Sequence, residues 1–104
     1  MIRGGINIYP AEVETFLRTH PKILDCYVIG IPDERFGEEL CVWIKLSVGE
    51  TDMSREEVKE FCKGNIAHFK VPKYVKIVEA FPVSATAKVQ KFKMIDQMKK
   101  ELGL

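Results

Sequence analysis

Hydrophobic positions recur along the chain with two different periods, which predict where its helices and strands lie. In three segments the apolar residues recur every three or four positions, which places them on one face of an α-helix. These predicted helices cover residues 10–19, 54–64 and about 91–103. Pro10 suits the first position of its helix, and Ser54 with Glu57 has the spacing of a capping box. The predicted apolar faces are Val13, Phe16 and Leu17, then Val58, Phe61 and Cys62, then Phe92, Ile95, Met98 and Leu102.

Three other segments are rich in β-branched and aromatic residues, a composition typical of strands. They cover residues 23–31, 40–48 and 74–78. Turn-like residues at 32–37 separate the first two, which are therefore expected to be neighbours, and residues 81–87 are expected to form an irregular loop. The order of elements predicts an α+β fold, with a small three-stranded, mainly antiparallel sheet packed with helices.

Length and composition limit what the chain can do by itself. Its 104 residues, 46% hydrophobic and 30% charged, are typical of one compact domain covering residues 1–104. A core of this size leaves little room for a deep pocket, and ligand clefts commonly lie between domains. We therefore expect the chain to work as part of a larger protein.

The cysteines and histidines do not predict a disulfide framework or a metal site. Cys26, Cys41 and Cys62 are odd in number and widely spaced in apolar runs, which indicates a reducing, intracellular location. His20 and His68 lack partners at ligand spacing, so no metal site is expected. No apolar run reaches 18 residues, so no membrane span is expected either.

Charge is distributed unevenly along the chain. Residues 1–62 contain seven basic and twelve acidic side chains, for a net charge of −5, whereas residues 63–104 contain nine lysines and three acids, for a net charge of +6. A lysine-rich half suits a phosphate-bearing partner, although a solvated lysine face has the same composition.

Two segments have the composition of a binding or catalytic loop. Gly4 and Gly5 stand before the first helix, where glycine allows a close approach of backbone to a ligand. Residues 81–91 contain small side chains followed by Lys88, whose ammonium could place a point charge against a phosphate and a carboxylate. Each segment taken alone is also compatible with an ordinary turn or a solvated lysine.

Five segments in the right order carry a resemblance to a known family. The first is the opening of the chain, which matches through Gly4, Gly5, Asn7, Ile8, Pro10, Glu12, Val13 and Glu14. The others follow at matching spacings and cover residues 20–23, 32–38, 68–72 and 82–91. Over essentially its whole length the chain resembles the C-terminal domain of the adenylate-forming superfamily of acyl-CoA synthetases, luciferases and peptide-synthetase adenylation domains. Within that superfamily it looks most similar to medium-chain acyl-CoA synthetases.

The resemblance implies roles for particular residues. It implies a mobile domain that closes on a large N-terminal domain, absent from this chain, where ATP with Mg²⁺ and the fatty acid bind. Lys88 is then the catalytic lysine of adenylate formation. A CoA-facing loop is implied for Arg3, Gly4, Gly5 and Asn7, and a cofactor contact for Lys91. The chain alone should be inactive, and its location should be the cytoplasm or the mitochondrial matrix.

Ala87 stands where the family usually has glycine, which leaves open whether adenylation is weakened. Two other functions fit parts of the sequence: a freestanding module that binds RNA or another polyanion, and a catalytically silent docking domain. RNA-binding domains usually place aromatic residues among basic ones on exposed strands. Here Tyr27, Trp43 and Tyr74 alternate with aliphatic residues as core strands do, so no nucleic-acid partner is expected.

Overall fold

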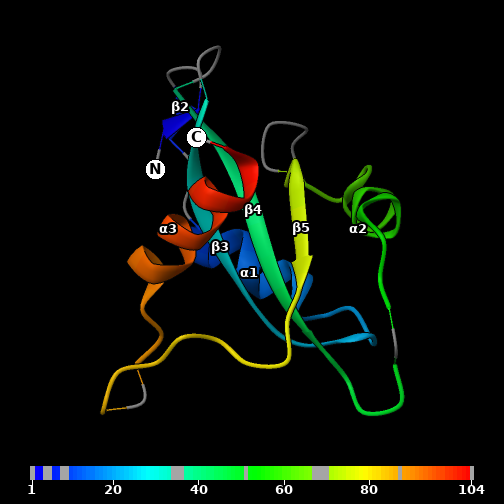
Figure 1. Ribbon diagram of the computed structural model, residues 1–104. Coiled ribbons are helices and arrows are strands. Elements are labelled where there is room, and N and C mark those ends of the chain that lie inside the picture. The colour runs from blue at the N-terminus through cyan, green and yellow to red at the C-terminus, as the bar shows by residue number, and fades with distance from the viewer. Residues whose placement is uncertain are drawn as a thin grey trace.

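The computed structural model describes residues 2–3, 6–7, 10–33, 37–50, 52–66, 71–86 and 88–103, with residues 2, 3, 6, 7, 33, 37 and 38 described by their backbone alone. A three-stranded sheet organises this part of the chain (Figure 1). β3 (Ile23–Asp33) pairs antiparallel with β4 (Gly37–Leu46), which pairs parallel with β5 (Tyr74–Ile77). The predicted α+β class and the three predicted strands are confirmed, and the sheet is mixed because β5 runs parallel to β4.

Three helices occupy the predicted segments. They are α1 (Pro10–Leu17), α2 (Arg55–Cys62) and α3 (Lys91–Leu102). The Ser54 hydroxyl accepts the Glu57 backbone N–H at 3.1 Å, which confirms the serine side of the capping box, while the Glu57 carboxylate accepts a hydrogen bond from Lys22 Nζ at 2.8 Å. α3 ends at Gly103, whose φ of 73° is the left-handed conformation that favours glycine at this position.

The two faces of the sheet carry separate cores, because successive side chains of a strand point to opposite sides. Along β4, Leu40 and Val42 pack in the core that α1 and α2 cover, whereas Cys41 and Trp43 pack in the core that α3 covers. Figure 1 shows this layering, with α1 behind the sheet and α3 in front of it. Helices therefore cover both faces of a small sheet.

The buried side of α3 differs from the predicted one. Phe92 and Leu102 were expected in the core, but they are 59% and 37% exposed. Met98 is buried and Ile95 partly buried, as expected, and Met94, which was not expected in the core, is buried beside them. Two apolar stripes exist on this helix, and their spacing alone does not decide which one faces the sheet.

The three cysteines predict a loss of stability at alkaline pH. Burial raises the pKa of the Cys26 and Cys41 thiols to about 12 and that of Cys62 to about 11. In the unfolded chain these thiols titrate near pH 8.5, so above about pH 9 the unfolded chain releases protons that the folded chain keeps. The free energy of unfolding should therefore fall as pH rises from 9 to 11, by up to about 1.4 kcal/mol per pH unit for each thiol.

Urea unfolding measured between pH 8 and pH 11 checks this dependence. Other groups also titrate in this range, so the matched control is Cys26→Ala, which should show a shallower fall than the parent chain. Identical slopes for the two proteins would contradict the assignment of the fall to buried thiols.

Candidate functional site

Lys88 follows the predicted loop, and an isolated bridge closes this part of the chain into a hairpin. Val83 and Val89 form an antiparallel bridge. The Ser84 N–H donates to the Lys88 carbonyl at 2.9 Å, and the Gln90 N–H donates to the Pro82 carbonyl at 2.9 Å. Residues 82–86 and 88–90 are therefore held together as the two arms of a turn, which Figure 1 shows extending away from the sheet.

Side chains brace the tip of this hairpin. The Ser84 and Thr86 hydroxyl oxygens lie 2.9 Å apart, and the Ser84 hydroxyl accepts the Lys88 N–H at 3.3 Å. The Lys88 side chain is exposed, and within the part of the chain that the structure describes no hydrogen bond or ion pair holds its ammonium. Ala87 lies outside the described residues, so its predicted effect on Lys88 stays a prediction.

Both ends of the hairpin rest on β3. Phe81, which precedes it, packs edge-on against the Tyr27 ring with centroids 4.8 Å apart and an interplanar angle of 82°. Lys91, which follows it, lies with its Nζ 5.9 Å from the centroid of the same ring. Tyr27 thus contacts the chain on both sides of the turn that carries Lys88, and its aromatic ring offers both an edge-to-face and a cation–π contact.

Lys91 forms an ion pair in addition to this ring contact. Its Nζ donates to Glu14 Oε2 at 2.8 Å, and the Glu14 side chain is only 7% exposed. The same carboxylate oxygen accepts the Val28 backbone N–H at 2.7 Å. The cofactor contact predicted for Lys91 stays a prediction, because what the structure places beside its ammonium is Glu14.

The glycine segment lies between two short strands. β1 (Ile2–Arg3) pairs antiparallel with β2 (Ile6–Asn7), with Arg3 opposite Ile6. The predicted loop residues Gly4 and Gly5 lie outside the described residues, and Arg3 and Asn7 are placed by their backbone alone. Figure 1 shows β2 at one end of the domain and residues 80–90, drawn in yellow to orange, at the other. Strand β2 and the Lys88 hairpin are therefore far apart.

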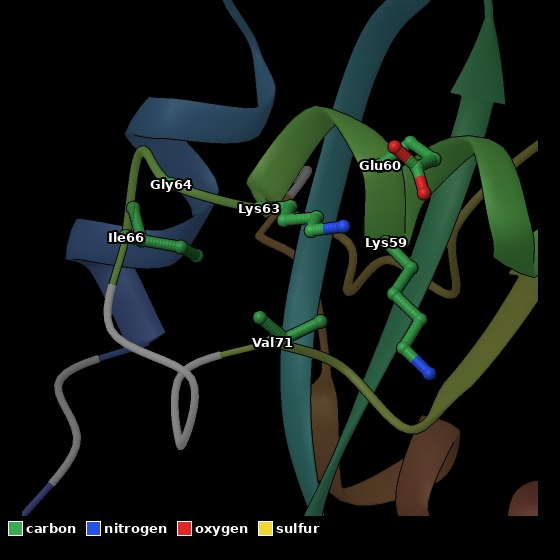
Figure 2. A pocket seen from close by; sticks show the side chains of 6 residues that line it. All are labelled: Lys59, Glu60, Lys63, Gly64, Ile66 and Val71. Carbon is green, nitrogen blue, oxygen red and sulfur yellow. The ribbon is translucent and has the colours of Figure 1, made fainter.

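A surface cavity of about 480 Å³ lies beside α2, away from both segments. Figure 2 shows its lining, in which Ile66 and Val71 are apolar and Lys59 and Lys63 carry charge. It contains none of the site residues predicted from the sequence. Among the described residues no three His, Cys, Asp or Glu side chains are grouped so as to hold a metal ion, and no helix there is long and apolar enough to cross a membrane.

Comparison with known proteins decides the family. The profile of the AMP-binding enzyme C-terminal domain matches residues 12–88. This chain belongs to that family. A zebrafish (Danio rerio) relative named medium-chain acyl-CoA ligase ACSF2, mitochondrial, is 53% identical over all 104 residues, which make up 17% of the relative's length.

Two further relatives support this assignment. The putative acyl-CoA synthetase YngI of Bacillus subtilis is 50% identical over 94 residues, covering 90% of this chain and 17% of that protein. The crystal structure of apo MatB from Rhodopseudomonas palustris superposes with a TM-score of 0.89 at 33% identity, covering 96% of this chain and 20% of that one. The resemblance inferred from these sequence motifs is confirmed, and the chain spans about a sixth to a fifth of the length of these relatives.

Glu14 is a residue of the site whose role was not predicted from the sequence. Glu14 was recognised only as part of the opening motif, yet it is a buried carboxylate that joins α1, β3 and α3. A signal was present, because Glu14 lies three positions before Leu17 and so falls on the apolar face of the predicted helix. A charged residue on such a face needs a partner, and the partner proved to be Lys91.

The contact between Phe81 and Tyr27 should contribute measurably to stability. Replacing Phe81 by Leu keeps an apolar side chain but removes the edge-to-face pair, which should lower the free energy of unfolding by about 1 kcal/mol. Phe92→Leu is the matched control, because Phe92 is 59% exposed, and it should change stability by less than about 0.5 kcal/mol. Urea unfolding of the three proteins measures both effects, and equal losses in the two variants would show that the ring pair has no special role.

Proposed function

We propose that this chain is the mobile C-terminal domain of a fatty-acid CoA ligase that acts on medium-chain acids. The proposal is supported by the family assignment and by the names of the relatives, one of which is a medium-chain acyl-CoA ligase over the matching segment. Its partner is a large N-terminal domain of the same protein, in which ATP with Mg²⁺ and the fatty acid bind. The small domain alone is inactive, because by itself it holds neither the nucleotide nor the acid.

The proposed reaction has two steps. In the first, the carboxylate of the fatty acid attacks the α-phosphate of ATP, so that an acyl-adenylate forms and pyrophosphate leaves. In the second, the thiol of CoA attacks the acyl carbonyl, so that the thioester forms and AMP leaves. Both steps are expected of this family, and each needs the small domain to present a different segment to the large one.

Lys88 is the proposed catalytic residue of the first step. Negative charge surrounds the reacting carboxylate and the α-phosphate, and an ammonium group placed between them stabilises the transition state, most strongly where water is excluded. The observation that carries this assignment is the exposed Lys88 side chain on a hairpin whose tip and base are both braced. Such a hairpin can insert its lysine into a neighbouring domain without first having to fold.

The glycine segment is the proposed CoA-facing element of the second step. Gly4 and Gly5 have no side chains to block the narrow pantetheine arm, and Arg3 and Asn7 flank them as polar neighbours. Strand β2, which follows the glycines, lies far from the Lys88 hairpin, which supports the proposal that different parts of the domain serve the two reaction steps. For the location of the protein we propose the cytoplasm or the mitochondrial matrix; the zebrafish relative is named as mitochondrial.

Replacing Lys88 by Ala tests the proposed function directly. In the full-length enzyme the loss of one charge-stabilising donor should slow adenylate formation about a hundredfold or more, because such a donor typically contributes about 3 kcal/mol. Thioester formation from pre-formed acyl-adenylate should stay close to the wild-type rate. The two half-reactions are followed separately by pyrophosphate release and by acyl-CoA appearance.

Gly5→Leu is the reciprocal control, because a leucine would obstruct the pantetheine arm and should impair thioester formation more than adenylation. Lys93→Ala, an exposed lysine of α3, controls for loss of positive charge and should leave both half-reactions unchanged. Near-wild-type adenylation by Lys88→Ala would reject the catalytic assignment and favour a domain kept for docking.

A further inference from the structure

The hairpin that carries Lys88 is tied to the opposite layer of the domain through one buried carboxylate. Glu14 Oε2 accepts two hydrogen bonds, from Val28 N at 2.7 Å and from Lys91 Nζ at 2.8 Å. Glu14 belongs to α1, Val28 to β3 and Lys91 to α3. One oxygen atom therefore joins three elements that are separated in the sequence.

The ion pair of Lys91 with Glu14 also restricts the position of Lys88. Only two residues separate Lys88 from Lys91, and the Gln90 N–H is already fixed on the Pro82 carbonyl at 2.9 Å. Lys91 is also the first residue of α3. Its place relative to Glu14 thus sets both the end of the hairpin and the start of the helix.

The rotation of α3 fits the same constraint. The face of α3 that points toward the sheet consists of Lys91, Met94, Ile95 and Met98. These residues have the i, i+3, i+4, i+7 spacing of one helix face. Lys91 is therefore the first residue of a stripe that is otherwise apolar. Turning the helix to bury the alternative stripe, which begins at Phe92, would pull Lys91 away from Glu14.

We propose that Glu14 and Lys91 are positioning residues, which hold the Lys88 hairpin in the orientation needed for adenylate formation. This inference rests on the proposed function of Lys88. The physical reason is that a buried carboxylate without a partner is strongly disfavoured, so any shift of the hairpin base that parts Lys91 from Glu14 is opposed. The Phe81 contact with Tyr27 holds the other end of the hairpin in the same way.

The alternative role for Lys91 is a direct contact with CoA, and the two roles predict different kinetics. A positioning residue affects the adenylation step, in which CoA takes no part. A CoA contact affects the KM for CoA in the thioester step and leaves adenylation unchanged. The half-reactions therefore separate them.

The test compares Lys91→Met and Glu14→Gln with the parent in the full-length enzyme, at a temperature at which all variants are folded by circular dichroism. Lys91→Met keeps the length of the side chain and removes its charge, whereas Glu14→Gln keeps an acceptor for Val28 N–H and removes the carboxylate. We expect each to lower kcat for adenylation about tenfold, with the KM for ATP and the KM for CoA both within twofold of the parent, because small misplacements of a catalytic group cost this much or more.

Conservative and control variants complete the design. Lys91→Arg keeps a cation opposite Glu14 and should restore most of the adenylation rate, which a role in fold stability alone does not predict once all variants are folded. Lys93→Met makes the same chemical change at an exposed position two residues on and should match the parent. If Lys91→Met does not fold, the double variant Glu14→Gln/Lys91→Met, which buries no unpaired charge, replaces it with the same expected loss.

Parent-like adenylation by folded Lys91→Met or by the double variant would overturn the proposal, as would a raised KM for CoA with unchanged adenylation. Lys88→Ala in the same series distinguishes this failure from that of the proposed function. If Lys88→Ala is slow and Lys91→Met is not, the positioning role alone is wrong. If Lys88→Ala is as fast as the parent, the catalytic assignment of Lys88 is wrong and the positioning proposal fails with it.

Discussion

The open edge of β3 is the constraint on which the arrangement of this domain depends. Within the described part of the chain, β3 pairs with β4 on one side only, so its other side presents backbone groups that need hydrogen-bond partners. Helix α1 supplies one, because Glu14 accepts the Val28 N–H, and Arg18, directly after the helix, supplies another by donating to the Cys26 carbonyl at 2.8 Å. Glu14 and Arg18 are four positions apart, so they lie side by side along the strand edge.

The hydrogen bond to Val28 places the Glu14 carboxylate at the edge of β3, and the charge of this carboxylate in turn binds α3. A carboxylate that is 7% exposed needs a cation, and Lys91 provides it from the first turn of α3, on the other face of the sheet. The two layers are therefore joined around the edge of β3 as well as through the sheet. Because Lys91 follows the Lys88 hairpin so closely, a feature that satisfies the backbone of β3 also fixes the segment proposed to act in catalysis.

Much of the fold could be predicted from the sequence because the local signals agree with each other. Pro10, the Ser54 cap and Gly103 mark helix ends by their own conformational preferences. Each helix, and each strand of the three-stranded sheet, lies within a few residues of its predicted bounds, whereas the short strands β1 and β2 were not predicted. Strand β3 runs through Pro32 into the predicted turn, which is compatible with a proline because β3 is an edge strand. The parallel pairing of β5 was not predicted, although a helix between two strands is the usual crossover of a parallel pair.

What could not be predicted depends on contacts between distant residues. The two possible apolar stripes of α3 have similar spacing. The buried one is accompanied by two ion pairs with distant residues, Lys91 with Glu14 and Glu101 with Lys76. The hydrogen bonds that hold the Lys88 hairpin could not be predicted either, because small residues such as Ser84 are typical of irregular loops as well. The resemblance to the family rested on motif order, which needs no knowledge of these contacts.

A double-mutant cycle on the unfolding free energy tests the central role of Glu14 most directly. Glu14→Gln, Lys91→Met and their combination are compared by urea unfolding. Glu57→Gln and Lys22→Met form the control pair, which has the same 2.8 Å separation but a carboxylate that is 43% exposed instead of 7%. We expect a coupling above about 1 kcal/mol for Glu14 and Lys91 and a smaller one for the control pair. Additive effects of Glu14→Gln and Lys91→Met, within about 0.5 kcal/mol, would contradict the account.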